Sequence, residues 1–227
     1  MLALVDAKST ILIDCGGDAM HRCLSCGIDP MSIQSVLLSH KDPDHVSGFP
    51  LFMVKLWLHG RKEPLPVYGI PSALDLVKKV YGAFDPGHWK GIHDVRWIET
   101  SLKPEAVVLE NDQWLIQSSP GKHGVPVVGY RFSNKATGIR VCYSCDTEPC
   151  DSIVSLAQGC DILIHEANGN IPGHSSTVQA ADVASRAGVN SLYLIHLSKD
   201  LTKDQVAAAK DIFPDTTVAK DGFILEL

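Results

Sequence analysis

The 227-residue sequence lacks features that would place it in several classes of protein. It has no run of 18 apolar residues, and no basic segment followed by an apolar one at its start. Neither a membrane span nor an export signal is therefore expected. Acidic residues outnumber basic ones by 26 to 20, which gives a net charge of −6. We expect a soluble, cytoplasmic protein without a membrane partner.

Clustered positive charge is also scarce. No block of Lys and Arg is longer than two residues, and the two pairs present are Arg61–Lys62 and Lys78–Lys79. Such pairs are typical of a solvated face, so the composition does not indicate a large nucleic-acid-binding surface.

Cysteine is present but does not form a disulfide framework. The seven cysteines are odd in number and scattered, which is typical of a reducing compartment. Two Cys-x-x-Cys pairs, Cys23/Cys26 and Cys142/Cys145, suggest a zinc ribbon. We reject it because Cys142 and Cys145 fall on a predicted strand, where residues three apart face opposite sides. Cys23 and Cys26 are interpreted as small thiols near the end of a helix.

The chain is expected to form one domain spanning residues 1–227, because it shows neither a linker nor an internal repeat. Strands are predicted at 10–14, 35–39, 66–69, 94–98, 106–109, 114–118, 127–132, 139–144, 161–165 and 191–196, with a final pair at Val218 and 223–225. Helices are predicted at 19–26, 49–58, 71–83, 152–156, 176–187 and 203–212. This mixture favours an α/β class in which helices cover the sheets.

The most informative segment is Val36–Gly48, Val-Leu-Leu-Ser-His-Lys-Asp-Pro-Asp-His-Val-Ser-Gly. A short apolar strand ends in a polar loop that contains His40, Asp42, Asp44 and His45. Imidazole and carboxylate groups are ligands of divalent metals. An irregular loop can point all four inward, whereas a helix would point residues two apart in different directions. The alternative is a solvated polar turn.

This segment resembles the His-x-His-x-Asp-His motif of the metallo-β-lactamase superfamily, with Asp42 in place of the second His. Other segments resemble the remaining family motifs in the same order: Ile11–Gly16, Gly121–His123 with Gly129–Phe132, Tyr143–Thr147 with Cys145 in place of the usual Gly, and Leu194–Ser198. Leu163–Asn168 and Gly173–Ser176 resemble signatures of the ribonuclease Z-like branch. The resemblance covers about residues 9–198 and implies a four-layer αββα sandwich.

Family members usually have an additional strand before the segment that matches Ile11–Gly16. Only about ten residues precede it here. The resemblance therefore implies either that this strand is missing or that the chain is shortened. An exposed sheet edge would follow, and a partner such as a second copy could cover it.

The resemblance also implies a set of metal ligands. His40, Asp42 and His123 would hold one ion, Asp44, His45 and His196 would hold a second, and Asp146 would bridge both. Two ions about 3.5–4 Å apart can hold a hydroxide and polarise an ester or phosphoryl oxygen. We expect one or two divalent ions, with zinc as the first choice. Asp42 adds a hard anionic donor, which favours Mn or Fe and could leave the first site partly filled.

Catalytic roles follow from the same resemblance. In the ribonuclease Z-like branch, a His equivalent to His174 protonates the leaving oxygen, and a Glu equivalent to Glu166 holds that His. With Asp44, these are the predicted catalytic residues. The alternative is that both are polar loop residues. His165 is interpreted as the end of a buried strand. The isolated histidines His21, His59, His88 and His93 are interpreted as surface or interface residues.

The predicted function is metal-dependent hydrolysis of a small phosphodiester by a metal-bound hydroxide. Ribonuclease Z proper has a long tRNA-gripping arm between the third ligand loop and the bridging Asp. Only 22 residues separate His123 from Asp146, so tRNA is not the expected substrate. A carboxylic ester, lactone or thioester hydrolase on the same centre is one alternative. A degenerate, non-catalytic metal-binding protein is another, and a mononuclear iron oxygenase is a more distant one. The substrate, the metal and a homodimeric state are left open.

Overall fold

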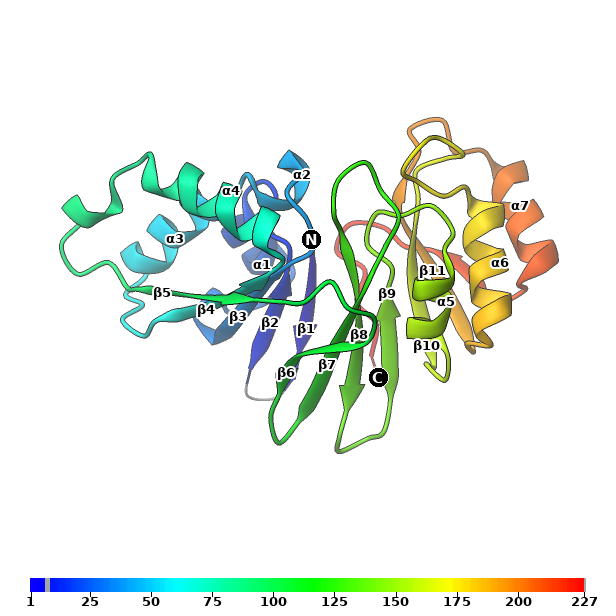
Figure 1. Ribbon diagram of the computed structural model, residues 1–227, viewed down its shortest axis with the longest axis horizontal. Helices are drawn as coiled ribbons and strands as arrows, with labels where there is room; N and C mark the ends of the chain where they lie inside the picture. The colour runs from blue at the N-terminus through cyan, green and yellow to red at the C-terminus, as the bar shows by residue number, and fades with distance from the viewer. Residues whose placement is uncertain (7–8, 227) are drawn as a thin grey trace. The chain divides into compact units, whose positions relative to one another are not determined.

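The computed structural model describes residues 1–6 and 9–226, which form two compact units (Figure 1). The first unit is Met1–Thr100 and the second is Ser101–Leu227. Each contains one sheet and its own helices. The mixed α/β class is thus confirmed, and the single domain spanning residues 1–227 stays a prediction. Among the described residues, no helix has both the length and the apolar composition needed to cross a membrane.

The first unit is built on a five-stranded sheet with the order β1-β2-β3-β4-β5. The strands are β1 (Leu2–Val5), β2 (Thr10–Ile13), β3 (Ile33–Leu38), β4 (Leu65–Gly69) and β5 (Val95–Glu99). Strands β2 to β5 are parallel, and β1 pairs antiparallel with β2. All of β2 and most of β3 are buried, as expected for the inner strands of a parallel sheet.

The helices of the first unit contact one another and the sheet. They are α1 (Ala19–Ser25), α2 (Pro43–Val46), α3 (Phe49–Leu58) and α4 (Pro71–Gly82), with short 3₁₀ turns at Pro30–Ser32 and Pro86–His88. Helix α1 contacts α3, α3 contacts α4, and α4 contacts β4 and β5. Pro71 occupies the first turn of α4, where a missing N–H costs no hydrogen bond.

Two elements of this unit differ from the sequence-based expectation. Strand β1 was not predicted; its alternating half-exposed pattern is a weak signal over four residues. This strand precedes Ile11–Gly16 and pairs with β2. The loop after β3, which was predicted to be irregular and to carry four metal ligands, is also partly helical. The one-turn helix α2 begins at Pro43 and contains Asp44 and His45.

The second unit contains a seven-stranded sheet with the order β12-β11-β10-β9-β8-β7-β6. The strands are β6 (Ala106–Glu110), β7 (Trp114–Pro120), β8 (Val128–Asn134), β9 (Arg140–Tyr143), β10 (Ile162–Ala167), β11 (Ser191–Leu197) and β12 (Thr216–Val218). Strands β6 to β9 are antiparallel neighbours, and β9 to β12 are parallel. The strand predicted at 223–225 is wrong, since these residues form no ladder.

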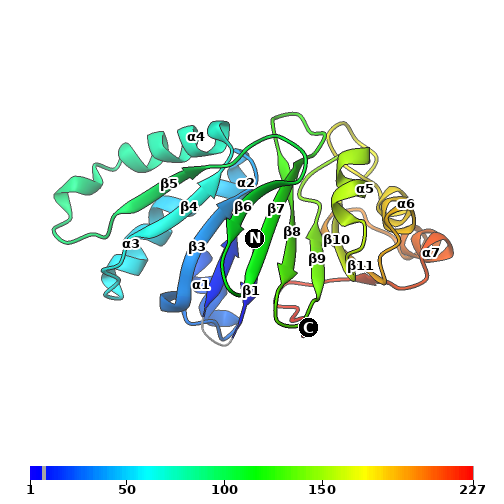
Figure 2. The same cartoon turned by 60° about the horizontal axis from the view of Figure 1, so that its bottom comes forward.

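Three helices accompany this sheet, as Figure 2 shows on the side of β10 and β11. They are α5 (Asp151–Ala157), α6 (Thr177–Ala187) and α7 (Lys203–Ile212). Helix α6 contacts β10, β11 and α7, and α7 also contacts β12. The predicted ends of α6 are confirmed: Ser176 caps it in a capping box with Gln179, and Gly188 ends it with a φ of 69°.

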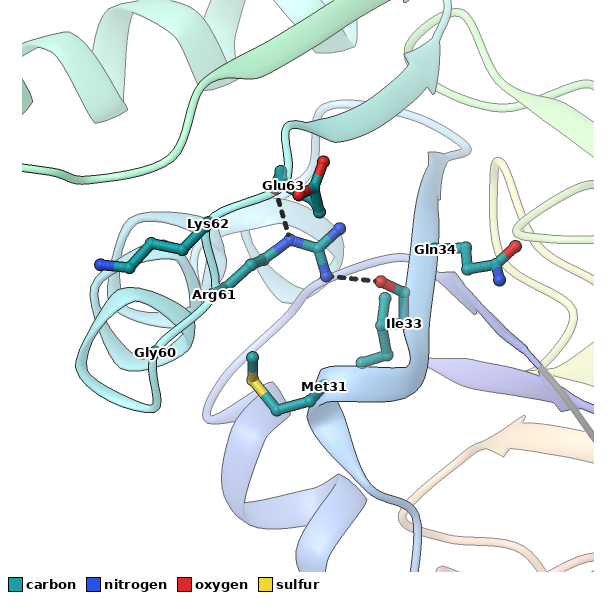
Figure 3. A pocket seen from close by; sticks show the side chains of 7 residues that line it. All are labelled: Met31, Ile33, Gln34, Gly60, Arg61, Lys62 and Glu63. Atoms are coloured by element: carbon teal, nitrogen blue, oxygen red, sulfur yellow. Dashed lines mark hydrogen bonds between the residues drawn. The ribbon is translucent and has the colours of Figure 1, made fainter.

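Arg61 corrects the interpretation of the basic pair Arg61–Lys62. The Arg61 side chain is only 7% exposed. It donates from one terminal nitrogen to the Ile33 carbonyl at 2.7 Å and from Nε to the Glu63 carbonyl at 3.0 Å. Figure 3 shows this arrangement beside a hollow of about 300 Å³, with the Lys62 side chain directed away from the Arg61 guanidinium. Arg61 therefore joins the start of β3 to the loop before β4.

Two other interpretations from the sequence are also changed. His93 is not a surface residue: it is 4% exposed, and burial together with the nearby positive charge of Arg61 lowers its pKa to about 4. Cys142 lies on β9, but Cys145 lies beyond the end of that strand. All seven cysteines are free thiols.

Candidate metal centre

In the first unit, the predicted ligands form two close pairs at the end of β3. His40 lies two residues after the end of the strand and is fully buried. Its Nε2 lies 3.7 Å from Asp42 Oδ2, and His45 Nε2 lies 3.3 Å from Asp44 Oδ2. Two ligands about 2.1 Å from a tetrahedral ion are about 3.4 Å apart. Each imidazole–carboxylate pair therefore has a spacing that a single ion can bridge.

Asp14 supports these histidines, and sequence reasoning did not assign it a role. Its carboxylate is fully buried and accepts from the Ser39 N–H and hydroxyl at 2.8 Å. Its Oδ2 also accepts from His45 Nδ1 at 2.7 Å. Burial by itself raises the pKa of Asp14, but the charge and hydrogen bond of His45 lower it below its usual value. The signal in the sequence was its place directly after strand β2.

This arrangement fixes the orientation of His45. A carboxylate accepts from Nδ1–H, so the lone pair of the neutral ring is on Nε2. The Ser39 hydroxyl also contacts His40 Nδ1 at 3.0 Å, on the ring side away from Asp42. Histidine ligands of metals commonly have such partners on the second nitrogen.

Close backbone contacts hold the turn after β2 against the ligand loop. Cys15 N donates to the His45 carbonyl at 2.7 Å, and Gly48 N donates to the Cys15 carbonyl at 2.9 Å. A Cβ at Gly16 would lie 1.6 Å from the Asp44 carbonyl oxygen, so only glycine fits there. This contact explains the Asp-Cys-Gly sequence that precedes the motif.

In the second unit, the predicted ligands come from three separate segments. His123 lies in the loop between β7 and β8, Asp146 follows β9, and His196 lies in β11. His196 Nδ1 is 3.6 Å from Asp146 Oδ1, again close to the spacing of two ligands on one ion. His123 Nδ1 donates to the Gly173 carbonyl at 2.7 Å, so the lone pair of the neutral ring is on Nε2.

His174 lies among these ligands. Candidate ligand atoms of His123, Asp146 and His174 all lie within 4.8 Å of one another, and so do those of Glu166, His174 and His196. The His174 ring is stacked at 5.6 Å from His196 and meets the His123 ring edge-on at 4.9 Å. The second unit thus brings together five of the predicted site residues.

The buried Glu166 carboxylate orients the His174 ring through a hydrogen bond. Its carboxylate has no exposed surface and accepts from His174 Nδ1 at 3.0 Å. Three backbone N–H groups also donate to it, those of Thr147, Asn168 and Ser175. Burial raises the pKa of Glu166 to about 7, and the donors from Asn168 and Thr147 limit this rise.

His165 is separate from this group. The ring is fully buried, and its Nδ1 donates to the Glu166 carbonyl at 2.8 Å. Burial lowers the pKa of His165 to about 4, so the ring stays neutral at physiological pH. This agrees with its interpretation as the end of a buried strand.

The donor set of each unit fits divalent metal ions. Neutral imidazoles with a fixed tautomer and ionised carboxylates are ligands of zinc, and the carboxylates also suit manganese or iron. The fold and this chemistry define a class of metallohydrolase-like proteins. A model of the beta-lactamase superfamily domain matches residues 9–197, and the chain belongs to that family.

Curated relatives extend the likeness along the whole chain. It is 29% identical to a ribonuclease Z of Methanothermobacter thermautotrophicus over 284 aligned residues, covering 100% of this chain and 90% of the relative. It is 27% identical to a ribonuclease Z of Bacillus licheniformis, covering 99% and 91%. The predicted resemblance to the ribonuclease Z-like branch of metal-dependent hydrolases is confirmed.

Solved structures show the same fold. The short form of human tRNase Z superposes with a TM-score of 0.81 at 19% identity, covering 99% of this chain and 90% of that one. A diphosphatase of the PhnP family gives 0.78 at 21% identity, covering 99% and 83%. The predicted metallo-β-lactamase fold is therefore confirmed.

Proposed function

We propose that this protein is a metal-dependent phosphodiesterase that hydrolyses a small phosphodiester. The observation that carries this proposal is the pair His174–Glu166 beside the ligands His123, Asp146 and His196. A phosphodiester with a poor leaving group benefits from a placed acid, and a buried carboxylate is suited to hold one.

We infer from the order of the family motifs that the residues of both ligand sets are metal ligands. In this assignment the ions would be held by residues of the first unit, His40, Asp42, Asp44 and His45, and of the second, His123, Asp146 and His196. The spacings within each unit support this assignment. When bound, the ions would activate water and neutralise charge on the phosphoryl oxygens. Zinc is the first choice, and Asp42 makes manganese or iron the alternatives.

The role of His174 follows from its hydrogen bonds. Nδ1 is held by Glu166, so Nε2 is the atom that can deliver a proton to the departing oxygen. The backbone donors on Glu166 keep its carboxylate fixed, which in turn fixes the His174 ring. Glu166 thus positions His174 and stabilises its protonated form.

A small substrate is preferred over tRNA for a structural reason. The alignment with the Methanothermobacter ribonuclease Z is 284 residues long, whereas this chain has 227, so that relative contains segments that this chain lacks. Between His123 and Asp146 the chain forms only β8, a turn and β9. We propose a cytoplasmic location, in keeping with seven free thiols.

Metal analysis combined with a substrate panel tests the proposal. Protein loaded separately with zinc, manganese and iron is assayed on phosphodiesters and on carboxylic esters, lactones and thioesters of matched leaving group. We expect one or two ions per chain and the highest kcat/KM on a phosphodiester. Preferential turnover of the carboxylic esters would favour the alternative hydrolase, and bound metal without any turnover would favour a binding protein.

A further inference from the structure

A hollow of about 270 Å³ opens beside His174 in the second unit. Its apolar lining consists of Pro149, Ile171 and Pro172. The polar lining consists of Glu148, Asn170, Gln179 and His174 itself. Ile171 is 51% exposed, a large exposure for an isoleucine that is held in place by backbone hydrogen bonds. The hollow is thus a partly apolar surface next to the proposed proton donor.

Hydrogen bonds within the loop before α6 preform this hollow. Gly169 N donates to the Ser175 carbonyl, Ile171 N to the Gly169 carbonyl, and His174 N to the Ile171 carbonyl, at 2.9–3.0 Å. Gly173 N donates to Glu148 Oε1 at 3.0 Å, which ties the loop to the segment after β9. A ligand would therefore meet a wall that is already ordered.

The amide groups present a defined polar edge. Gln179 Oε1 accepts from Ser176 N at 2.8 Å, which leaves its Nε2 to donate to Asn170 Oδ1 at 3.4 Å. Asn170 is therefore oriented with its oxygen toward Gln179, and its Nδ2 group can donate to a carbonyl or ring nitrogen of a ligand. An apolar wall with an amide edge suits a flat heterocycle with polar edges.

Charge in the hollow disfavours a second anionic group. Neither Lys nor Arg is among the seven lining residues. The Glu148 carboxylate forms an ion pair with Lys122 Nζ at 2.6 Å. A leaving group with its own phosphate would meet an ionised carboxylate here.

We propose that this hollow receives the leaving alcohol of the substrate, and that Ile171 and Asn170 select an uncharged nucleoside at that position. The inference rests on the proposed function, because it places the leaving oxygen at His174. Water supplies the oxygen that bonds to phosphorus, the bond from phosphorus to the alcohol oxygen breaks, and His174 Nε2 protonates that oxygen. The products are a phosphomonoester and a free nucleoside.

Two diesters that share a methyl group test this selection. In one the second alcohol is uridine, bound through its 5′ oxygen; in the other it is ethanol. Ile171→Ala and Asn170→Ala should each lower kcat/KM for the uridine diester by about 5- to 20-fold, mainly through KM, and change that for the ethyl diester less than twofold. Ile212→Ala and Asn190→Ala replace an exposed isoleucine and asparagine of the same unit, and serve as matched controls.

A third diester carrying a phosphate on the uridine 3′ oxygen tests the charge argument. The wild type should hydrolyse it with a lower kcat/KM than the uridine diester without the additional phosphate, and Glu148→Gln should reduce the difference between these two kcat/KM values. Equal turnover of the uridine and ethyl diesters by the wild type, or equal losses on both in the Ile171 and Asn170 variants, would overturn the pocket assignment while leaving the phosphodiesterase intact.

Direct binding separates failure of the pocket from failure of the proposed function. Free uridine is titrated into the metal-loaded protein by NMR or calorimetry. Saturable binding that is weakened in Asn170→Ala and Ile171→Ala, and unchanged in the two control variants, supports the nucleoside pocket even if no diester is hydrolysed. Absence of saturable uridine binding overturns the nucleoside pocket, whichever substrates the protein hydrolyses.

Discussion

Three residues at or next to the proposed ligand positions have a left-handed backbone although none is glycine. Asp14, Cys145 and His196 have φ values of 61°, 54° and 46°. This conformation costs a non-glycine residue about 1–2 kcal/mol. His196 lies at the irregularity in the β10–β11 ladder, where Glu166 pairs with Ile195 and Ala167 with Leu197. Local strain therefore coincides with the residues that aim or support the proposed ligands.

Asp42→His tests Asp42, the proposed ligand that differs from the family motif. The substitution replaces a hard anionic oxygen with a borderline nitrogen, so zinc occupancy of the first site should rise relative to manganese. The centre also becomes one charge more positive, and an anionic phosphodiester should bind more tightly while a neutral ester gains little. Titration of both proteins with zinc and manganese, counting ions per chain, measures this. Unchanged stoichiometry and selectivity would mean that Asp42 is not a ligand.

Asp14→Asn tests the support of His45. The amide can still accept from Ser39, but it loses the charge that fixes His45 Nδ1 as a donor. Metal affinity should fall by about 10- to 100-fold, the usual effect of losing a partner of a ligating histidine. Competition with a chelator measures the affinity. Asp75→Asn, at an exposed position on α4, is the control, and an equal loss there would point to a nonspecific charge effect.

His174→Ala separates an acid from a residue that shapes the pocket. Bound metal should be retained, and kcat should fall by about 10²–10⁴ on a diester with an alkyl leaving group. The loss should be much smaller for a nitrophenyl leaving group, which needs little protonation. Rate measurements over a series of leaving groups give this dependence. Equal losses across the series would contradict the proton-donor role.

At the level of elements, the strands that precede proposed ligands pair with their neighbours in different ways. Strand β3 is an inner strand of a parallel sheet, and β9 changes from an antiparallel neighbour to a parallel one. Each of these strands pairs with a neighbour on both sides. The β-ladders therefore fix the position at which the following ligand loop begins. A loop between rigid strands can hold polar groups in a strained arrangement because the strands resist relaxation.

Arg61 provides a test of how one such strand is anchored. It joins the segment after α3 to the first residue of β3 through a buried guanidinium. Arg61→Gln should lower the free energy of unfolding of the metal-free protein by about 1–3 kcal/mol, because buried carbonyls lose their donors. Denaturant unfolding measures the change. Lys62→Gln, whose side chain points away, should have almost no effect (Figure 3).

At the level of the whole molecule, two buried histidines make stability depend on pH. The pKa values of His93 and His165 are lowered to about 4 by burial. Because the unfolded chain binds these protons near pH 6.5 and the folded protein does not, the contribution of these two histidines to stability is fully present above that pH. It is lost as pH falls from about 6.5 toward 4.

His93→Gln should reduce this acid sensitivity. Between pH 7 and pH 5, the wild type should lose about 1–2 kcal/mol more unfolding free energy than the variant, because the variant has one fewer group to protonate. Urea titrations of the metal-free proteins at both pH values give the difference. Parallel losses in the two proteins would show that His93 is already protonated or accessible in the folded state.

Most of the fold was predictable from short-range patterns. The boundaries of α3 and α7, the caps of α6 and the inner strands follow from apolar periodicity and capping residues, which act within a few positions. The missed elements, β1 and α2, have only four residues each. Such segments are stabilised by the neighbours they pair with and not by their own propensity.

The sequence by itself determined the family and the chemical types of the candidate ligands, because these depend on residue identity and spacing. Tertiary structure decided which residues support them. Asp14 meets His45 across 31 positions, and the Gly173 carbonyl meets His123 across 50. It also buried Arg61, which the sequence assigned to a solvated face, and His93, which it assigned to the surface or an interface. Burial and long-range hydrogen bonds arise only when distant segments pack together, so no local pattern encodes them.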